Sequence, residues 1–101
     1  MSIFRTCDVS MERYDVNVEL FGVPRLLAGV RVAPAAGRTL GEIAHFLGVR
    51  YPALCGRVID RETGWLVDGY TFVVDERFTR EEWRTVTTAS SVLLVSSVAG
   101  G

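Results

Sequence analysis

The sequence predicts a single α+β domain in which a mixed β-sheet is covered on one face by one main helix. Two observations predict it. Several apolar segments alternate with the period of a strand, and one segment has apolar residues at the spacing of a helix. The length of 101 residues fits one domain, and apolar residues make up 49% of the chain, which is enough for a modest core. We therefore expect a globular domain rather than a disordered chain.

The first two strands are expected to form an antiparallel pair. Residues 15–22, DVNVELFG, alternate between apolar and more polar side chains, which is typical of a half-buried strand. Pro24 and Gly29 then indicate a loop, and Val30 to Val32 can form a short second strand. The two strands would pair as a hairpin with a long connection.

The main helix is predicted over about residues 39–48. Thr39 and Glu42 have the spacing of a capping box, in which each side chain accepts a hydrogen bond from a backbone N–H at the start of the helix. Gly48 is a plausible end of the helix. The apolar stripe that should face the core consists of Leu40, Ile43, Ala44 and Leu47.

The second half of the chain predicts two further strands. Residues 53–65 are expected to form a short helix or turn and then a loop. Gly69 to Asp75 alternates and is rich in strand-forming residues, so it predicts a long strand. Residues 77–86 predict a helical turn or an extended link, and residues 91–95, SVLLV, predict the last strand.

The last strand is apolar on both faces. Val92 and Leu94 should face the helix, and Leu93 and Val95 should then face away from it. Either another element covers this second face, or the face is exposed next to the tail and binds a partner. Phe21, on the outward side of the first strand, would add to such a docking surface.

Charge and cysteine content argue against several classes of protein. The net charge is −1 with no basic run, so a nucleic-acid partner is not expected. The two cysteines, Cys7 and Cys55, lack a zinc-binding spacing and are expected to be reduced thiols, and no metal site is predicted. Residues 1–14 have no apolar core of a signal peptide and no segment suits a membrane span, so we expect a loose leader and a cytoplasmic protein.

Three sequence segments together resemble the ubiquitin-like β-grasp sulfur carriers of bacteria and archaea, the group that contains the small subunit of molybdopterin synthase and the thiamine-pathway carrier. The resemblance covers Asp15 to Gly101, and its segments are VELFGVPRLLAG, TLGEIAHFLGVRYPAL and the final VAGG. It implies a β-grasp domain over residues 15–95 and a flexible tail over residues 96–101 that ends in Gly-Gly.

The resemblance also implies a chemistry for the tail. A partner enzyme of the E1-like, adenylating type would use ATP to activate the Gly101 carboxylate, which would become a thiocarboxylate and donate sulfur to a biosynthetic enzyme. A carboxylate has a pKa of about 3.5, is anionic at neutral pH and is a poor electrophile, so it needs such activation. Gly100, Ala99 and Val98 would give access to a partner's active site. The chain itself would be a carrier without a bound cofactor, not an enzyme.

Two other functions remain open, a ubiquitin-like protein modifier and a β-grasp interaction domain with an inert tail. The sequence also leaves open which biosynthetic pathway would receive the sulfur: that of the molybdenum cofactor, thiamine, cysteine or a specialised metabolite. His45 is expected to be solvated and Cys55 to be buried as a small apolar residue. The aromatic residues of the strand regions are expected to pack rather than to bind a ligand.

Overall fold

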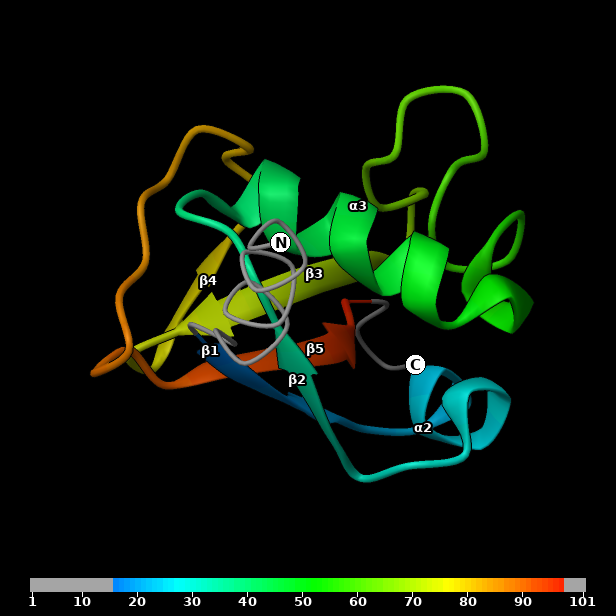
Figure 1. Cartoon of the computed structure of the whole chain (residues 1–101), viewed down its shortest axis with the longest axis horizontal. Helices are drawn as coiled ribbons and strands as arrows, with labels where there is room; N and C mark the ends of the chain where they lie inside the picture. Colours follow the sequence, from blue (N-terminus) through cyan, green and yellow to red (C-terminus); the bar gives the residue numbers. More distant parts are fainter. Residues whose placement is uncertain (1–15, 98–101) are drawn as a thin grey trace, which may run out of the picture.

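The computed structural model describes residues 16–97, in which five strands form one sheet in the order β2-β1-β5-β3-β4 (Figure 1). In chain order, the elements are β1 (Val16–Leu20), α2 (Val23–Ala28), β2 (Val32–Ala35), α3 (Leu40–Arg50), the 3-10 helix η1 (Pro52–Leu54), β3 (Tyr70–Val74), β4 (Arg77–Thr79) and β5 (Val92–Ser96). β1 and β5 are parallel, whereas the other neighbouring strands are antiparallel. The predicted mixed sheet with one main helix across one face is confirmed.

The core lies between α3 and the sheet face that α3 covers (Figure 1). All four residues of the predicted helix stripe have an exposed fraction of 0%. Alternate residues of the strands meet them, because successive side chains of a strand point to opposite faces. The largest side chains buried in this core are Phe72, Leu20, Leu40, Ile43, Leu47, Leu54, Ile59 and Leu94.

The start of α3 carries the predicted capping box with one local difference. The Thr39 Oγ1 accepts a hydrogen bond from the Glu42 backbone N–H at 3.2 Å. The Glu42 Oε1 accepts from the N–H of Arg38 at 2.7 Å, one residue before the cap. Both hydrogen bonds occupy backbone N–H groups at or just before the start of α3, where no intrahelical carbonyl can accept them.

Residues 82–86 consist of a turn followed by an isolated β-bridge at Thr85, and they also cap α3. The Leu40 N–H donates to the Arg84 carbonyl at 2.9 Å, and the Gly41 N–H donates to the Glu82 carbonyl at 2.8 Å. The expected link over residues 77–86 is therefore β4 followed by this segment, and it contains no α-helix.

The predicted end of the main helix at Gly48 is wrong, because α3 continues to Arg50. Gly48 is buried, and a Cβ atom built there would lie 3.3 Å from the Ile59 Cγ2 and 3.4 Å from the Cys55 Sγ. The glycine thus allows residues 55–59 to approach the helix closely rather than ending it.

The predicted second strand is displaced along the sequence from Val30–Val32 to β2. The connection before it contains α2, which sequence patterns did not indicate, and Gly29 ends that helix at φ +80°. Strand pairing begins only where the Leu20 N–H donates to the Arg31 carbonyl at 2.8 Å. β2 can include Pro34 because β2 is an edge strand of the sheet.

β3 and β4 form a hairpin that sequence analysis did not predict. Asp75 and Glu76 connect the strands, and both have positive φ, 51° and 74°. Two such residues are characteristic of the type I′ turn that matches strand twist in tight hairpins. Asp75 also holds the start of β5, since its Oδ1 accepts from the Ser91 N–H at 3.0 Å and its own N–H donates to the Ser91 carbonyl at 2.9 Å.

Candidate functional site

The tail residues with predicted roles lie outside the described residues. They are Val98, Ala99, Gly100 and Gly101. The structure does define the strand from which the tail continues, and it defines the faces of the sheet beside that strand. These two features form the described part of the candidate site.

The base of the tail is held by the central strand of the sheet. β5 pairs with β1 on one side and with β3 on the other, so both of its edges are occupied. The Phe21 N–H donates to the Leu94 carbonyl at 3.2 Å, and the Ser97 N–H donates to the Gly69 carbonyl at 2.7 Å. The chain is therefore hydrogen-bonded to the domain up to Ser97, so Ser96 and Ser97, which the expected tail of residues 96–101 included, belong to the ordered sheet region.

The two faces of β5 have the predicted orientations. Val92 and Leu94 point into the core and have exposed fractions of 2% and 0%. Leu93 and Val95 point to the opposite face and are half-buried. The predicted register of this strand is thus confirmed.

The sheet face opposite α3, called the outer face, carries a row of residues across all five strands. Pairing of neighbouring strands places them in the order Val32, Glu19, Leu93, Val73 and Phe78. Val32 is 46% exposed and Phe78 is 71% exposed, so the outer face is open at both edges within residues 16–97. Apolar residues thus line most of this row.

A second row extends the outer face toward the end of β5 from which the tail continues. Phe21 follows β1, is 41% exposed and shares the side of Glu19 by alternation. Val95 lies opposite Thr71, whose hydroxyl donates to the Thr79 carbonyl at 3.0 Å. Because that polar group is already bonded, the surface there is effectively apolar. We call the outer apolar patch the set Phe21, Val32, Val73, Phe78, Leu93 and Val95.

Three residues of the outer apolar patch were predicted from sequence and three were not. Phe21, Leu93 and Val95 follow from alternation in long strands. Predicting the positions of Val32 and Val73 on the outer face requires the pairing register of their strands. Predicting the position of Phe78 requires recognition of the β3–β4 hairpin. The only sequence signal for that hairpin was a pair of residues that tolerate a turn, Asp75 and Glu76.

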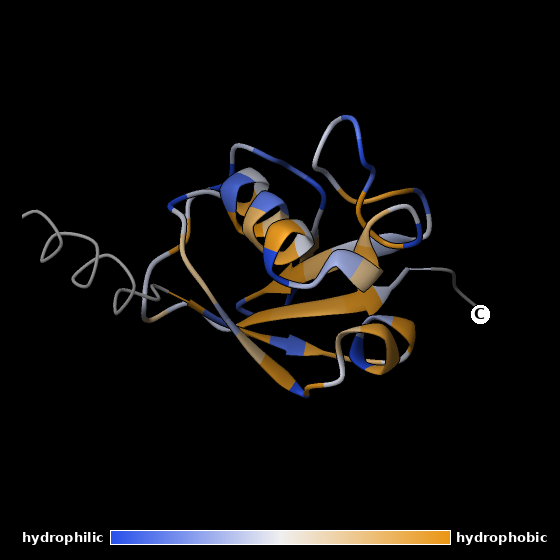
Figure 2. Cartoon of the chain, turned by 45° about the vertical axis from the view of Figure 1, so that its right-hand side comes forward, coloured by the Kyte–Doolittle hydropathy of each residue, from blue (hydrophilic) through white to orange (hydrophobic). Residues whose placement is uncertain are grey.

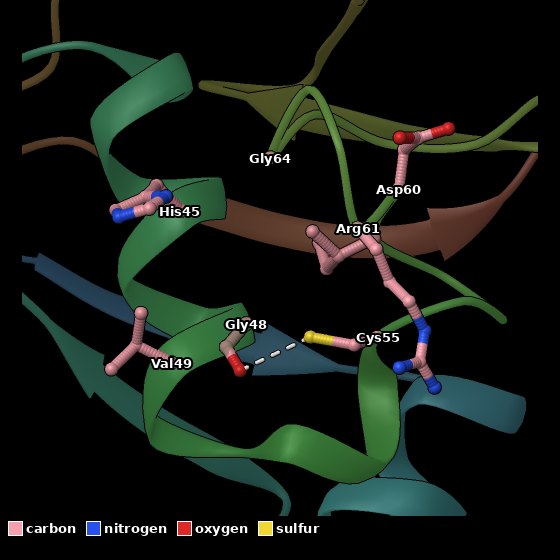
Figure 3. A pocket seen from close by; sticks show the side chains of 8 residues that line it. His45, Gly48, Val49, Cys55, Asp60, Arg61 and Gly64 are labelled. Atoms are coloured by element: carbon pink, nitrogen blue, oxygen red, sulfur yellow. Dashed lines mark hydrogen bonds between the residues drawn. The ribbon is translucent and has the colours of Figure 1, made fainter.

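A small cavity lies away from the outer face, between α3 and the loop after η1 (Figure 3). Its volume is about 140 Å³, and its lining includes His45, Cys55 and Arg61. The thiol of Cys55 is half-buried and donates to the Gly48 carbonyl at 3.3 Å, whereas His45 is exposed and lies apart from the sulfur (Figure 3). Cys55 is thus less buried than expected, and its neighbours form no nucleophile and base pair.

One carboxyl beside this cavity has a perturbed pKa. The Asp60 Oδ1 accepts from the N–H groups of Thr63 at 3.0 Å and Glu62 at 2.7 Å. These backbone hydrogen bonds, that of Thr63 first, hold the pKa of Asp60 below its ordinary value. Their role is to shape the loop of residues 60–64, where the Gly64 N–H also donates to the Asp60 carbonyl.

The described residues contain no group of three or more histidine, cysteine and acidic side chains placed to hold a metal ion. None of the helices within residues 16–97 has both the length and the apolar character needed to cross a bilayer.

Comparison with known proteins identifies the fold. No protein-family model and no curated protein matches the sequence. Among solved structures, small archaeal modifier protein 1 (SAMP1) from Methanosarcina acetivorans matches with a TM-score of 0.73 and 20% identity, over 86% of this chain and 96% of that one. CysO from Mycobacterium tuberculosis matches with a TM-score of 0.68 and 22% identity, over 83% of this chain and 100% of that one.

A third match is a chain of the BexX/CysO complex from Amycolatopsis orientalis, with a TM-score of 0.68 and 22% identity over 85% of this chain and 99% of that one. The three matches cover 83–86% of this chain and 96–100% of the other chains, so they concern the whole domain and not a shared fragment. This protein therefore has the ubiquitin-like β-grasp fold that SAMP1 and CysO share.

Proposed function

We propose that this protein is a sulfur carrier whose C-terminal glycine is activated by a partner enzyme and then converted to a thiocarboxylate. One observation carries the proposal. The Gly100-Gly101 sequence follows within a few residues of a central strand whose hydrogen bonds extend to Ser97. A rigid domain thus ends beside a short segment of small residues that an enzyme can enclose closely.

The proposed chemistry takes place at the carbonyl carbon of Gly101. A carboxylate oxygen attacks the α-phosphorus of ATP, and pyrophosphate leaves to give an acyl adenylate. A hydrosulfide ion supplied by a partner then attacks that carbon, AMP leaves with the bonding electron pair, and loss of the S–H proton gives the thiocarboxylate. The activating enzyme supplies ATP and the catalytic groups, and this chain supplies the reactive carbon and the surface that binds the enzyme.

The outer apolar patch is proposed as that binding surface. Exposed apolar areas on monomeric proteins often mark binding sites, and this patch, which Glu19 interrupts between Val32 and Leu93, includes residues of the strand that continues into the tail. Binding there would leave the tail free to enter an active site on the same enzyme. The existence of the BexX/CysO complex supports the idea that a protein with this fold works with a second protein.

The test is the intact mass of the purified protein after incubation with its activating enzyme, ATP and a sulfur source. The expected product has the terminal OH replaced by SH. Deleting Gly101 moves the carboxylate back by about 3.3 Å or more and should abolish the reaction without loss of stability. Gly100→Val should block the reaction by bulk, whereas the control Val49→Ala, which changes an exposed side chain of α3, should react normally.

If the Gly101 deletion still acquires sulfur, or the intact chain acquires neither adenylate nor sulfur, the carrier proposal fails. An interaction domain with an inert tail would then replace it.

A protein modifier is the second candidate, favoured by the fold shared with small archaeal modifier protein 1. Both functions use the acyl adenylate and differ in the group that attacks it, a sulfur atom or a target amine. This chain contains no lysine, so it cannot form chains through its own side-chain amines. A covalent adduct with another protein that resists thiols, in place of the thiocarboxylate, would select the modifier.

A further inference from the structure

A second exposed apolar surface lies at one end of the sheet, on α2 and the loop that leads into β2. Leu26 is 79% exposed and Val23 is 41% exposed, although both belong to a helix of six residues. In Figure 2, α2 is mostly orange and lies beside the carboxyl end of β5. The helix packs on β5 and η1 and leaves these two side chains in solvent.

The same surface contains a shallow hollow of about 280 Å³. Its lining residues are Arg25, Leu26, Gly29, Val30 and Arg31, and we call this group the α2 surface. Two arginines therefore line the hollow together with the apolar residues Leu26 and Val30. A surface with both arginine and apolar side chains suits a peptide segment that carries both charged and apolar groups.

The charge of the α2 surface is uniformly positive. No acidic residue occurs between Glu19 and Glu42, whereas the chain as a whole has a net charge of −1. Within residues 16–97, the Arg25 and Arg31 side chains form no hydrogen bond or ion pair. Since arginine side chains bind carboxylates in paired hydrogen bonds, the two have free capacity for an acidic ligand.

The backbone beneath the two arginines is fixed. The Arg25 carbonyl accepts from the Gly29 N–H at 2.9 Å, and the Arg31 carbonyl accepts from the Leu20 N–H at 2.8 Å. Binding would therefore order only side chains and not the loop, which lowers the entropic cost of an interface.

We propose that the α2 surface binds an acidic segment of a partner protein that carries a large apolar side chain. Carboxylates of the segment pair with Arg25 and Arg31, and its apolar side chain contacts Leu26 and Val30. The inference does not depend on the chemistry of Gly101. It adds a second protein interface at an end of the sheet, made of other residues than the outer apolar patch but next to Phe21 and Val32 of that patch.

The test uses the full-length chain labelled for NMR and the synthetic peptide acetyl-Glu-Asp-Leu-Phe-Asp-Glu-amide as probe. We expect saturable shift changes confined to residues 20–31. A peptide with Gln and Asn in place of the acids, and one with Ser in place of Leu and Phe, should each bind at least about tenfold more weakly, since each lacks one of the two interactions.

Variants locate the binding on this surface. The double change Arg25→Ser and Arg31→Ser, or the single change Leu26→Ser, should weaken binding about tenfold or more while leaving the melting temperature unchanged, because these side chains are exposed. The control Arg77→Ser removes an exposed arginine from β4, the edge strand at the other end of the sheet from β2, and should leave binding intact.

Four results would overturn the proposal. The first is an absence of shifts at residues 20–31. The second is equal binding of the peptide without Leu and Phe, or saturation by inorganic phosphate, which would indicate a simple anion site. The third is self-association that Leu26→Ser abolishes, which would assign the surface to a second copy. The fourth is a shift of the same residues on deletion of residues 1–15, which would make the chain's own leader the occupant.

Discussion

The two faces of β5 have nearly the same composition and different surroundings. Val92 and Leu94 are enclosed beneath α3, with exposed fractions of 2% and 0%, whereas Leu93 and Val95 are half-buried on the open outer face. Hydropathy alone cannot separate the two pairs. Their difference shows that strand register decides whether an apolar residue stabilises this domain or forms part of a candidate interface.

The inner face gives the largest expected effect. Leu94→Asp places a carboxylate in the core with no partner, and the cost should be about 4 kcal/mol or more. That is comparable to the whole stability of a small domain, so the variant should be largely unfolded. Circular dichroism melts and NMR shift dispersion measure this. A cooperative melt at a temperature close to that of the original chain would show that Leu94 is not essential to the core, which would contradict the assignment of the inner face of β5.

Truncation of α3 above the same face should have a smaller effect. Leu47→Ala leaves a cavity next to the sheet and should lower the free energy of unfolding by about 2 to 5 kcal/mol. Val49→Ala is the matched control, because Val49 is on the same helix and 67% exposed, and it should change stability by less than about 0.5 kcal/mol. Urea denaturation gives both values. Equal losses would mean that α3 is not the cover of this core.

Substitutions on the outer face should affect partner binding more than they affect the free energy of unfolding. Leu93→Asp or Val95→Asp should lower the free energy of unfolding by only about 1 kcal/mol. If the proposed function holds, the same changes should weaken binding to the proposed activating enzyme about tenfold or more, because the new charge is desolvated at the interface. Asn17→Asp adds the same charge elsewhere on this face, away from the outer apolar patch, and serves as control. If Leu93→Asp unfolds the domain and Leu94→Asp does not, the register is shifted by one residue.

The smallest effect concerns the turn that positions Phe78 on the outer face. Glu76 has φ 74°, so Glu76→Gly should relieve backbone strain and raise stability by about 0.5 to 1 kcal/mol. Glu76→Ala removes the same charge but keeps the Cβ atom, and it should give no such gain. Denaturation midpoints distinguish the two variants. A loss of stability in Glu76→Gly would show that the turn is not strained.

The sequence predicted the elements whose evidence is local. β1, β3, β5 and α3 have clear periods, and both faces of β5 follow from alternation once that strand is recognised. α2 was missed because its six residues are too few for a helical period and include Pro24. β4 was missed because its three residues are too few to show an alternation, although its partner β3 is only two residues away in the chain. The hydrogen bonds of residues 82–86 to the start of α3 could not be predicted, because they join distant parts of the chain.

The candidate site was predictable to the same extent. Alternation placed Leu93, Val95 and Phe21 on one side, and the structure confirms that placement. The contributions of Val32 and Phe78 depend on which strands are neighbours, and periodicity does not contain that information. The roles of Gly100 and Gly101 stay predictions.

The position of β5 also has a consequence for folding. β5 follows every other described element in the chain, yet it lies between the β1–β2 pair and the β3–β4 pair. In a nascent chain without β5, the β1–β2 pair and the β3–β4 hairpin are not joined into one sheet, and a two-stranded hairpin alone is marginally stable in water. Insertion of β5 must therefore complete the sheet late, through contacts between distant parts of the chain. A partner that recognises Leu93 and Val95 beside β1 and β3 would consequently bind only chains that have finished folding, so the proposed activation would exclude incompletely synthesised chains.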